Sequence, residues 1–213
     1  GWGEMHLLGY FLPVASAELA AFLTSARADR ERRAREMVEK LVAAGVRIDD
    51  GMVLAAAAGG AVGRPHVARA LMEAGAVRSL DDAFDRYLGR GRAAYVEKRL
   101  PAFRDVAALV HRLGGVVSAA HLKDRGSKGN LERLRAAGLD AVETRHPSHD
   151  PDTRARLTDL ALKLRLGRSG GSDWQAQPAG GERNRAKGTQ PAPYEWPEAP
   201  RARLEHELAS RPE

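Results

Sequence analysis

The stretch that decides the fold is GGVVSAAH, residues 114–121. Its two glycines follow an apolar helical pattern, and residues 116–120 carry the small and β-branched side chains of a buried strand. A helical pattern over 131–137 and the next predicted strand over 139–144 follow. Because helices that alternate with strands are typical of parallel sheets, the sequence predicts an α/β fold after Pro101.

Polar residues follow each predicted strand of this region. His121 ends the first strand, His146 and His149 follow the second, and Asp173 lies in SGGSDWQ, residues 169–175, which we expect to be a glycine turn after an apolar run. Each residue alone is typical of an ordinary turn or a structural histidine. Since the carboxyl ends of parallel strands meet at one edge, polar residues after three such strands together predict a metal or phosphate site.

The region before Pro101 has a different pattern. Residues 5–11, MHLLGYF, predict a buried strand that contains His6, whereas residues 16–98 are almost entirely helical in short pieces and predict an inserted helical domain. Ser16 and Gly45 indicate the start and the end of the first helix.

Two sets of basic residues in the helical region are candidates for binding phosphate. Arg64 and His66 flank a predicted helix start at Pro65, where backbone N–H groups favour anions. Arg30 and Arg33 lie in an arginine-rich helix and present the forked guanidinium that matches phosphate. The alternatives are an ordinary capped helix with a surface histidine and a solvated helix face.

Composition sets limits on the function. The 213 residues contain no Cys, which excludes disulfides and thiolate metal sites and favours a cytoplasmic location. No apolar run is long enough for a membrane span. The net charge of +6 and the pI near 10 indicate a polyanionic partner or, equally well, an arginine-heavy composition that reflects the base composition of the genome.

Six motifs occur in the order found in the PHP (polymerase and histidinol phosphatase) family. The chain resembles most its metal-dependent phosphoesterases acting on nucleoside 3′,5′-bisphosphates and short RNA 5′ ends. The motifs are HLLGYF (6–11), GRPH (63–66), AYV (94–96), AH (120–121), Glu143 with HPSH (146–149), and GGSD (170–173).

The resemblance implies a distorted, TIM-like (β/α)7 barrel with a small inserted helical domain. It also implies two or three divalent metal ions (Mn, Mg, Fe or Zn) that activate water against a phosphoester. By motif, His6, His121 and Asp173 are the implied metal ligands. Residues resembling those that hold the substrate phosphate are Arg64, His66, Arg33 and Arg30.

The chain also departs from the family pattern. It lacks the family's first His-x-His strand, Leu122 stands where the family has Pro, and Gln175 stands where it keeps a ligand histidine. His146, His149 and Gln175 are therefore possible additional ligands. We expect the C-terminal portion of a longer barrel, or a degenerate relative, that needs its missing N-terminal segment or an oligomeric partner.

These observations predict four segments, a barrel strand over 1–15, a helical insertion over 16–98, C-terminal barrel units over 99–175, and a loop with a short helix over 176–213. The expected function is metal-dependent hydrolysis of nucleotide phosphomonoesters or oligonucleotide 5′ phosphodiesters. The alternative is a non-catalytic module that binds nucleotides or other polyanions. Whether the chain is an active enzyme is left open by the missing ligands.

Overall fold

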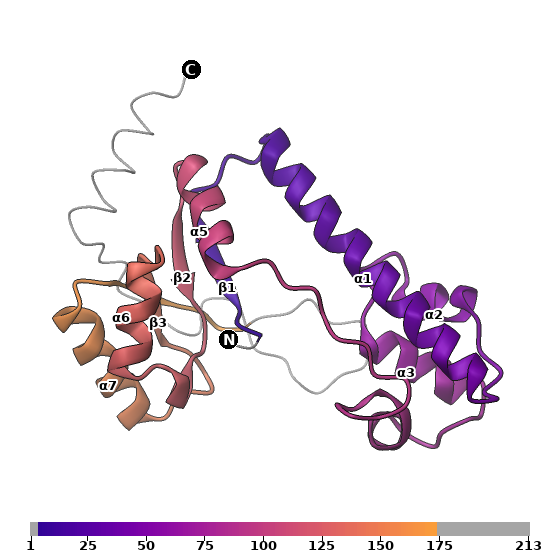
Figure 1. Ribbon diagram of the computed structural model, residues 1–213. Coiled ribbons are helices and arrows are strands. Elements are labelled where there is room, and N and C mark those ends of the chain that lie inside the picture. Colours follow the sequence, from indigo (N-terminus) through magenta and orange to yellow (C-terminus); the bar gives the residue numbers. More distant parts are fainter. Residues whose placement is uncertain (1–3, 174–213) are drawn as a thin grey trace. The chain divides into compact units, whose positions relative to one another are not determined.

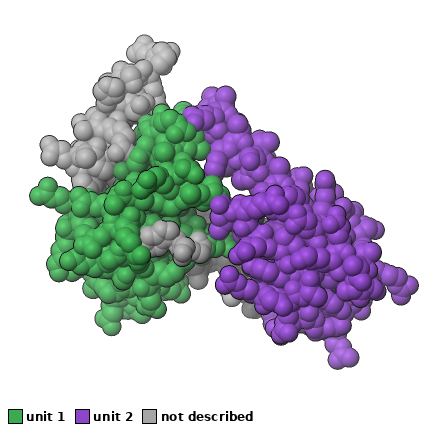
Figure 2. Space-filling model, viewed as in Figure 1, with its two compact units in different colours: residues 1–14, 101–213 green, residues 15–100 purple. Residues whose placement is uncertain are grey.

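The computed structural model describes residues 4–173, and the chain divides into two compact units (Figure 2). Unit 1 contains residues 1–14 and 101–213, and unit 2 contains residues 15–100. Unit 2 is therefore inserted in the sequence between the first strand of unit 1 and the rest of that unit. The predicted loop and helix over 176–213, together with Gln175, lie outside the described residues.

Unit 1 is a four-stranded sheet with helices, which confirms the mixed α/β class (Figure 1). The strands lie in the order β1-β2-β3-β4; β2, β3 and β4 are parallel as predicted, whereas β1 pairs with β2 antiparallel. Its elements are β1 (Leu7–Tyr10), α5 (Phe103–Arg112), β2 (Val116–Ala119), the 3₁₀ turn η2 (Lys123–Arg125), α6 (Lys128–Ala136), β3 (Ala141–Arg145), α7 (Pro151–Lys163) and β4 (Gly167–Gly170).

The two faces of this sheet differ in chemistry. Val117 and Val142 belong to an apolar core that they share with residues of α5, α6 and α7, such as Leu131. Because side chains alternate along a strand, Ser118 and Glu143 point to the opposite face. There the Ser118 hydroxyl lies 2.7 Å from that of Ser169 on β4. Ser118, Ser169 and Glu143 therefore place buried polar groups on the face opposite to the apolar core.

Two strand predictions need correction. The glycine turn expected from residue 169 onward is in part a strand, since β4 extends to Gly170 and its pairing with β3 is irregular between Glu143 and Arg145. The strand around His6 is half-buried rather than buried, because β1 is an edge strand, and the His6 side chain is 63% exposed.

Unit 2 is helical throughout its regular structure. Its elements are α1 (Ala17–Ala43), α2 (Asp50–Ala57), α3 (Arg64–Glu73), α4 (Leu80–Ala83) and the π-helical turn η1 (Phe84–Leu88). The Ser16 hydroxyl accepts the N–H of Leu19 at 3.1 Å and caps α1, as its position in the sequence predicts. Unit 2 has an apolar core of its own, in which Leu41 and Leu71 are completely buried.

None of the helices in residues 4–173 combines the length with the apolar character that crossing a bilayer requires. The longest helix, α1, is rich in charged side chains.

Candidate metal centre

Four segments of unit 1 bring polar side chains to one edge of the sheet. His121 follows β2, His146 follows β3 and Asp173 follows β4, so all three lie at carboxyl ends of parallel strands. His6 precedes β1, which runs in the opposite direction, and Leu7 pairs with Ala119 at the end of β2. The antiparallel pairing therefore brings His6 to the edge that holds the other three.

The histidines of this edge form a row. Nε2 of His121 lies 2.9 Å from Nδ1 of His6, and the two rings meet edge to face with centroids 4.8 Å apart. The His121 and His146 rings are 5.3 Å apart, and those of His146 and His149 are 5.5 Å apart. The structure thus brings together the predicted ligands His6 and His121 and both additional histidines.

A buried carboxylate, that of Glu143, is hydrogen-bonded to the backbone of this row. Glu143 on β3 accepts the backbone N–H of His121 through Oε2 at 2.8 Å. Burial, opposed by this hydrogen bond and reinforced by the nearby charge of Asp173, raises the pKa of Glu143 to about 7. Two neighbours of the carboxylate, His121 and Asp173, have left-handed backbone conformations with φ of 34° and 52°, which non-glycine residues rarely adopt.

The two additional histidines differ in which ring nitrogen carries the proton. Nδ1 of His146 accepts the backbone N–H of Ser148 at 3.1 Å, so its proton is on Nε2, which lies 3.8 Å from Oδ2 of Asp173. Nδ1 of His149 lies 3.4 Å from the carbonyl oxygen of Thr144 and donates to it. The buried Nε2 of His149 then carries a lone pair and has no hydrogen-bond partner among the described residues.

The charge of His149 is set by its surroundings. Burial, and to a smaller extent the positive charge of Arg154, lowers the pKa of His149 and so favours the neutral ring. A neutral imidazole with a lone pair is the form that binds metal ions.

These donors fit a divalent metal ion in chemical type, and one pair of them fits in spacing. Imidazole nitrogens and carboxylates are the usual ligands of Zn, Mn and Fe. Two ligand atoms at right angles, each about 2.1 Å from an ion, lie about 3.0 Å apart, which matches the 2.9 Å between His6 and His121. Within residues 4–173, no three His, Asp or Glu side chains already converge on one point, so a third ligand would have to move into place.

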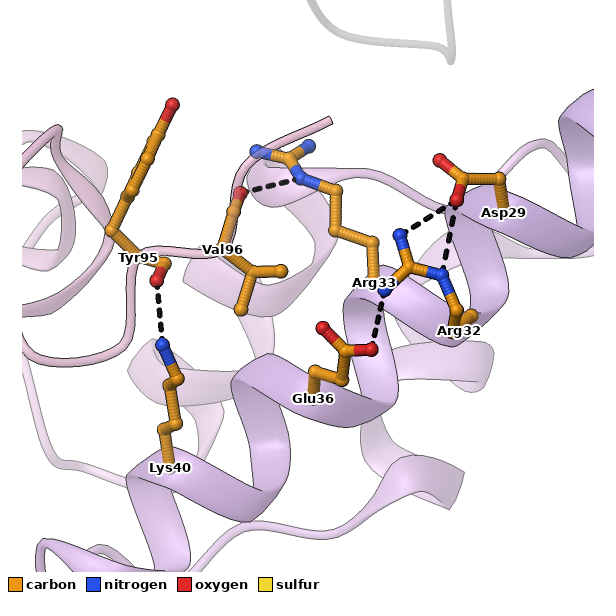
Figure 3. A network of polar contacts seen from close by, with 7 residues as sticks. All are labelled: Asp29, Arg32, Arg33, Glu36, Lys40, Tyr95 and Val96. Carbon is orange, nitrogen blue, oxygen red and sulfur yellow. Dashed lines mark hydrogen bonds and ion pairs between the residues drawn. The ribbon is translucent and has the colours of Figure 1, made fainter. Parts of the chain in front are cut away.

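The four basic residues predicted to hold a substrate phosphate all lie in unit 2. Arg33 is buried and its Nε donates to the carbonyl oxygen of Val96 at 2.8 Å (Figure 3). Nδ1 of His66 accepts the N–H of Gly63 and so caps α3, and the guanidinium of Arg64 stacks over a phenyl ring. Arg30 is exposed on α1.

Glu143 is the site residue to which sequence reasoning assigned no role. It appeared only as part of a motif. One signal was present, because its carboxylate follows the apolar residues Ala141 and Val142 in a strand whose first four residues are buried. A buried acidic side chain requires a partner, and that partner is the N–H of His121.

Comparison with known proteins shows what this chain is similar to. No protein-family model matches it. It is 33% identical over 189 residues to the 3′,5′-nucleoside bisphosphate phosphatase of Chromobacterium violaceum, which covers 84% of this chain and 66% of that protein. It is 32% identical over 177 residues to the 5′-3′ exoribonuclease Rnm of Salmonella typhimurium, which covers 80% of this chain and 60% of that protein. The chain thus spans less than two thirds of these relatives' length.

Solved structures agree with these relatives. A structure from Bifidobacterium adolescentis, classed as a metal-dependent phosphoesterase, matches 97% of this chain and 73% of its own length, with a TM-score of 0.70 and 29% identity. An amidohydrolase from Chromobacterium violaceum, crystallised with sulfate and no metal, matches 93% of this chain and 72% of its own length, with a TM-score of 0.68 and 26% identity.

Proposed function

We propose that this chain is a metal-dependent phosphoesterase of the PHP type, which hydrolyses a phosphoester of a nucleotide or of an RNA 5′ end with the help of a divalent metal ion; its similarity to a nucleoside bisphosphate phosphatase and to 5′-3′ exoribonucleases supports this. The observation that carries the proposal is the row of imidazoles at the carboxyl edge of the sheet. There His6 and His121 already have the spacing of two ligands of one ion.

His6, His121 and Asp173 are the residues that we propose as metal ligands, with Mn²⁺ as the first candidate because imidazole and carboxylate suit it. When bound, such an ion lowers the pKa of a water molecule and offsets negative charge on the phosphoryl oxygens. The chain's own contribution is orientation. Nε2 of His146 faces Asp173 Oδ2 at 3.8 Å, and the buried Nε2 of His149 offers a further nitrogen ligand.

Arg30, Arg33, Arg64 and His66 remain our candidates for a second phosphate of the substrate. Arg30 has the strongest case because its side chain is exposed, whereas the other three already have partners inside unit 2. A nucleotide or RNA substrate would be met in the cytoplasm, which is the location that we propose.

We also propose that the four strands form part of the distorted (β/α)7 barrel. Two features support this. One face of the sheet carries the polar side chains of Ser118 and Glu143, as the inner face of a barrel with a polar site would, and polar residues follow the carboxyl ends of three parallel strands. The proposed domain borders are those of the two units, close to residues 15 and 100.

The decisive experiment compares two histidine variants of unit 1. His121→Ala removes a proposed ligand, whereas His111→Ala removes a histidine whose Nε2 lies 2.7 Å from Asp140 at the far edge of the sheet. Metal-stripped proteins are titrated with Mn²⁺ and assayed on a nucleoside 3′,5′-bisphosphate and on a 5′-phosphorylated oligonucleotide. We expect His121→Ala to lose Mn²⁺ binding and activity, and His111→Ala to keep both.

Unchanged metal binding in His121→Ala would refute the proposed centre. A wild-type chain that binds nucleotide tightly but neither Mn²⁺ nor any other divalent ion would instead favour the non-catalytic binding module.

A further inference from the structure

Two buried carboxylates of the β3 segment hold backbone N–H groups of β2 and of the residues after it. Glu143 accepts the N–H of His121 at 2.8 Å, at the edge that carries the histidine row. Asp140, directly before β3, accepts the N–H of Val117 at 2.8 Å, at the opposite edge. Both are less than a tenth exposed. The same kind of bond thus occurs once at the candidate site and once away from it.

The hydrogen bond between the His121 N–H and Glu143 lies just beyond the last backbone hydrogen bond of the sheet. The last ladder-type bond of this segment runs from the N–H of Ala120 to the carbonyl oxygen of His6 at 3.0 Å. At the next residue the chain turns, because His121 has a φ of 34°. A non-glycine residue keeps such a conformation only where its surroundings hold it, and the Glu143 carboxylate is the group bonded to it there.

The Glu143 carboxylate lies where a side chain on residue 171 would otherwise be, and residue 171 is a glycine. A Cβ atom on Gly171 would lie 2.9 Å from Oε1 of Glu143, closer than real contacts allow. Gly171 does not have a positive φ. A Cβ atom at this position would therefore displace the end of the Glu143 side chain from where it lies.

We propose that Glu143 is a positioning residue: its carboxylate fixes the backbone of His121, and thereby the nitrogen spacing of the His6–His121 pair, while Gly171 leaves the room in which that carboxylate lies. The ion-binding consequence rests on the proposed function. The positioning of His121 does not depend on it.

Two conservative variants of the full chain separate this role from a role of the negative charge. Glu143→Gln keeps the chain length and a carbonyl oxygen that can accept the His121 N–H, but removes the charge. Glu143→Asp keeps the charge but draws the oxygens back by one methylene. The measurements are hydrogen exchange of the His121 amide by NMR and the Kd of Mn²⁺ by calorimetry.

If Glu143 positions His121, Glu143→Gln keeps the slow exchange of the His121 amide and changes the Kd of Mn²⁺ by no more than about threefold. Glu143→Asp loses the protection of that amide. It also weakens Mn²⁺ binding roughly 10–100-fold, as is usual when a partner of a metal ligand is removed. Gly171→Ala, which displaces the carboxylate, should resemble Glu143→Asp. The reverse order, with Gln worse than Asp, would overturn the proposal.

Asp140→Ala is the matched control, because it removes the equivalent bond at the other edge. It should lower the free energy of unfolding but leave the Kd of Mn²⁺ unchanged. The His121 amide should also stay as well protected from exchange, once the lower global stability of the variant is taken into account. An equal loss in Asp140→Ala would mean general loosening and would also overturn the proposal. A wild-type chain that binds neither Mn²⁺ nor any other divalent ion would refute the proposed function and the ion-binding half of this inference. The exchange data would still decide whether Glu143 holds His121.

Discussion

At the scale of single residues, neighbouring histidines differ in the atom that each can still offer. His146 uses Nδ1 to accept a backbone N–H, so it presents a proton toward Asp173. His149 directs Nδ1 at a carbonyl oxygen and leaves a buried lone pair on Nε2. Residue type and spacing in the sequence cannot separate these two cases, because the difference arises from the turn that follows β3.

The raised pKa of Glu143 predicts a pH-dependent stability. Between pH 4.5, its ordinary pKa, and about 7, the folded protein keeps a proton that the unfolded chain has released. The free energy of unfolding should therefore fall as pH rises through this window, by about 3 kcal/mol. Urea unfolding of metal-free protein at several pH values measures it.

The control for this prediction is Glu143→Gln, which removes the titrating group and keeps the other groups. His149 changes stability in the opposite direction, since a lowered pKa means that stability is lost as pH falls. Its contribution is the same in both proteins, so the difference between their curves isolates Glu143. Parallel curves from pH 4 to pH 8 would contradict the prediction.

At the scale of elements, the helices could be predicted more closely than the strands. Ser16 and Gly45 define α1 to within about one residue, because a cap and a stop are local signals. β4 lacks any such signal, since its sequence GRSG has neither apolar alternation nor β-branched residues and is a strand only through pairing with β3. The antiparallel direction of β1 depends on tertiary contacts and was not predictable from periodicity.

The polar contacts of α1 predict unequal roles for two adjacent arginines (Figure 3). Arg33 is buried and holds the carbonyl oxygen of Val96, while Arg32 bonds Asp29 and Glu36 on the surface of the same helix. Arg33→Ala should lower the free energy of unfolding of unit 2 by roughly 1–3 kcal/mol, because it leaves a buried carbonyl oxygen without its donor. Chemical denaturation followed by circular dichroism measures the loss.

Arg32→Ala is the matched control, since solvent screens its ion pairs and their net contribution to stability is small. Equal losses in the two variants would show that Arg33 contributes charge rather than a buried hydrogen bond. Such a result would strengthen the case for Arg33 among the phosphate-binding candidates, because its guanidinium would then not be needed to hold the segment at Val96.

At the scale of the whole molecule, each unit has its own apolar core, and we predict separate unfolding. Leu71→Ala in unit 2 and Leu157→Ala in unit 1 each remove a completely buried side chain. Each should lower the stability of its own unit by about 2–5 kcal/mol and leave the other transition in place. Differential scanning calorimetry of the full chain resolves the two transitions. A single transition that both variants shift equally would show that the units unfold together.

The two-unit organisation was predictable in outline from the change of periodicity near residues 16 and 98, because helical and strand patterns differ over many residues. Which residues meet at the candidate site was harder to predict from the sequence. His6 and His121 are separated by more than half of the chain, and only the β1–β2 pairing explains why their ring nitrogens meet.

That same pairing has a consequence for synthesis on the ribosome. β1 is translated before unit 2, and its partner β2 emerges roughly a hundred residues later. At about 5–20 residues per second, Leu7 and Leu8 wait on the order of 5–20 s without their partner strand. By then unit 2 has had time to fold on its own core, so that a folded insertion rather than a long flexible loop separates the two strands. We therefore expect the folding of the insertion to influence how quickly the nascent chain can join His6 to His121.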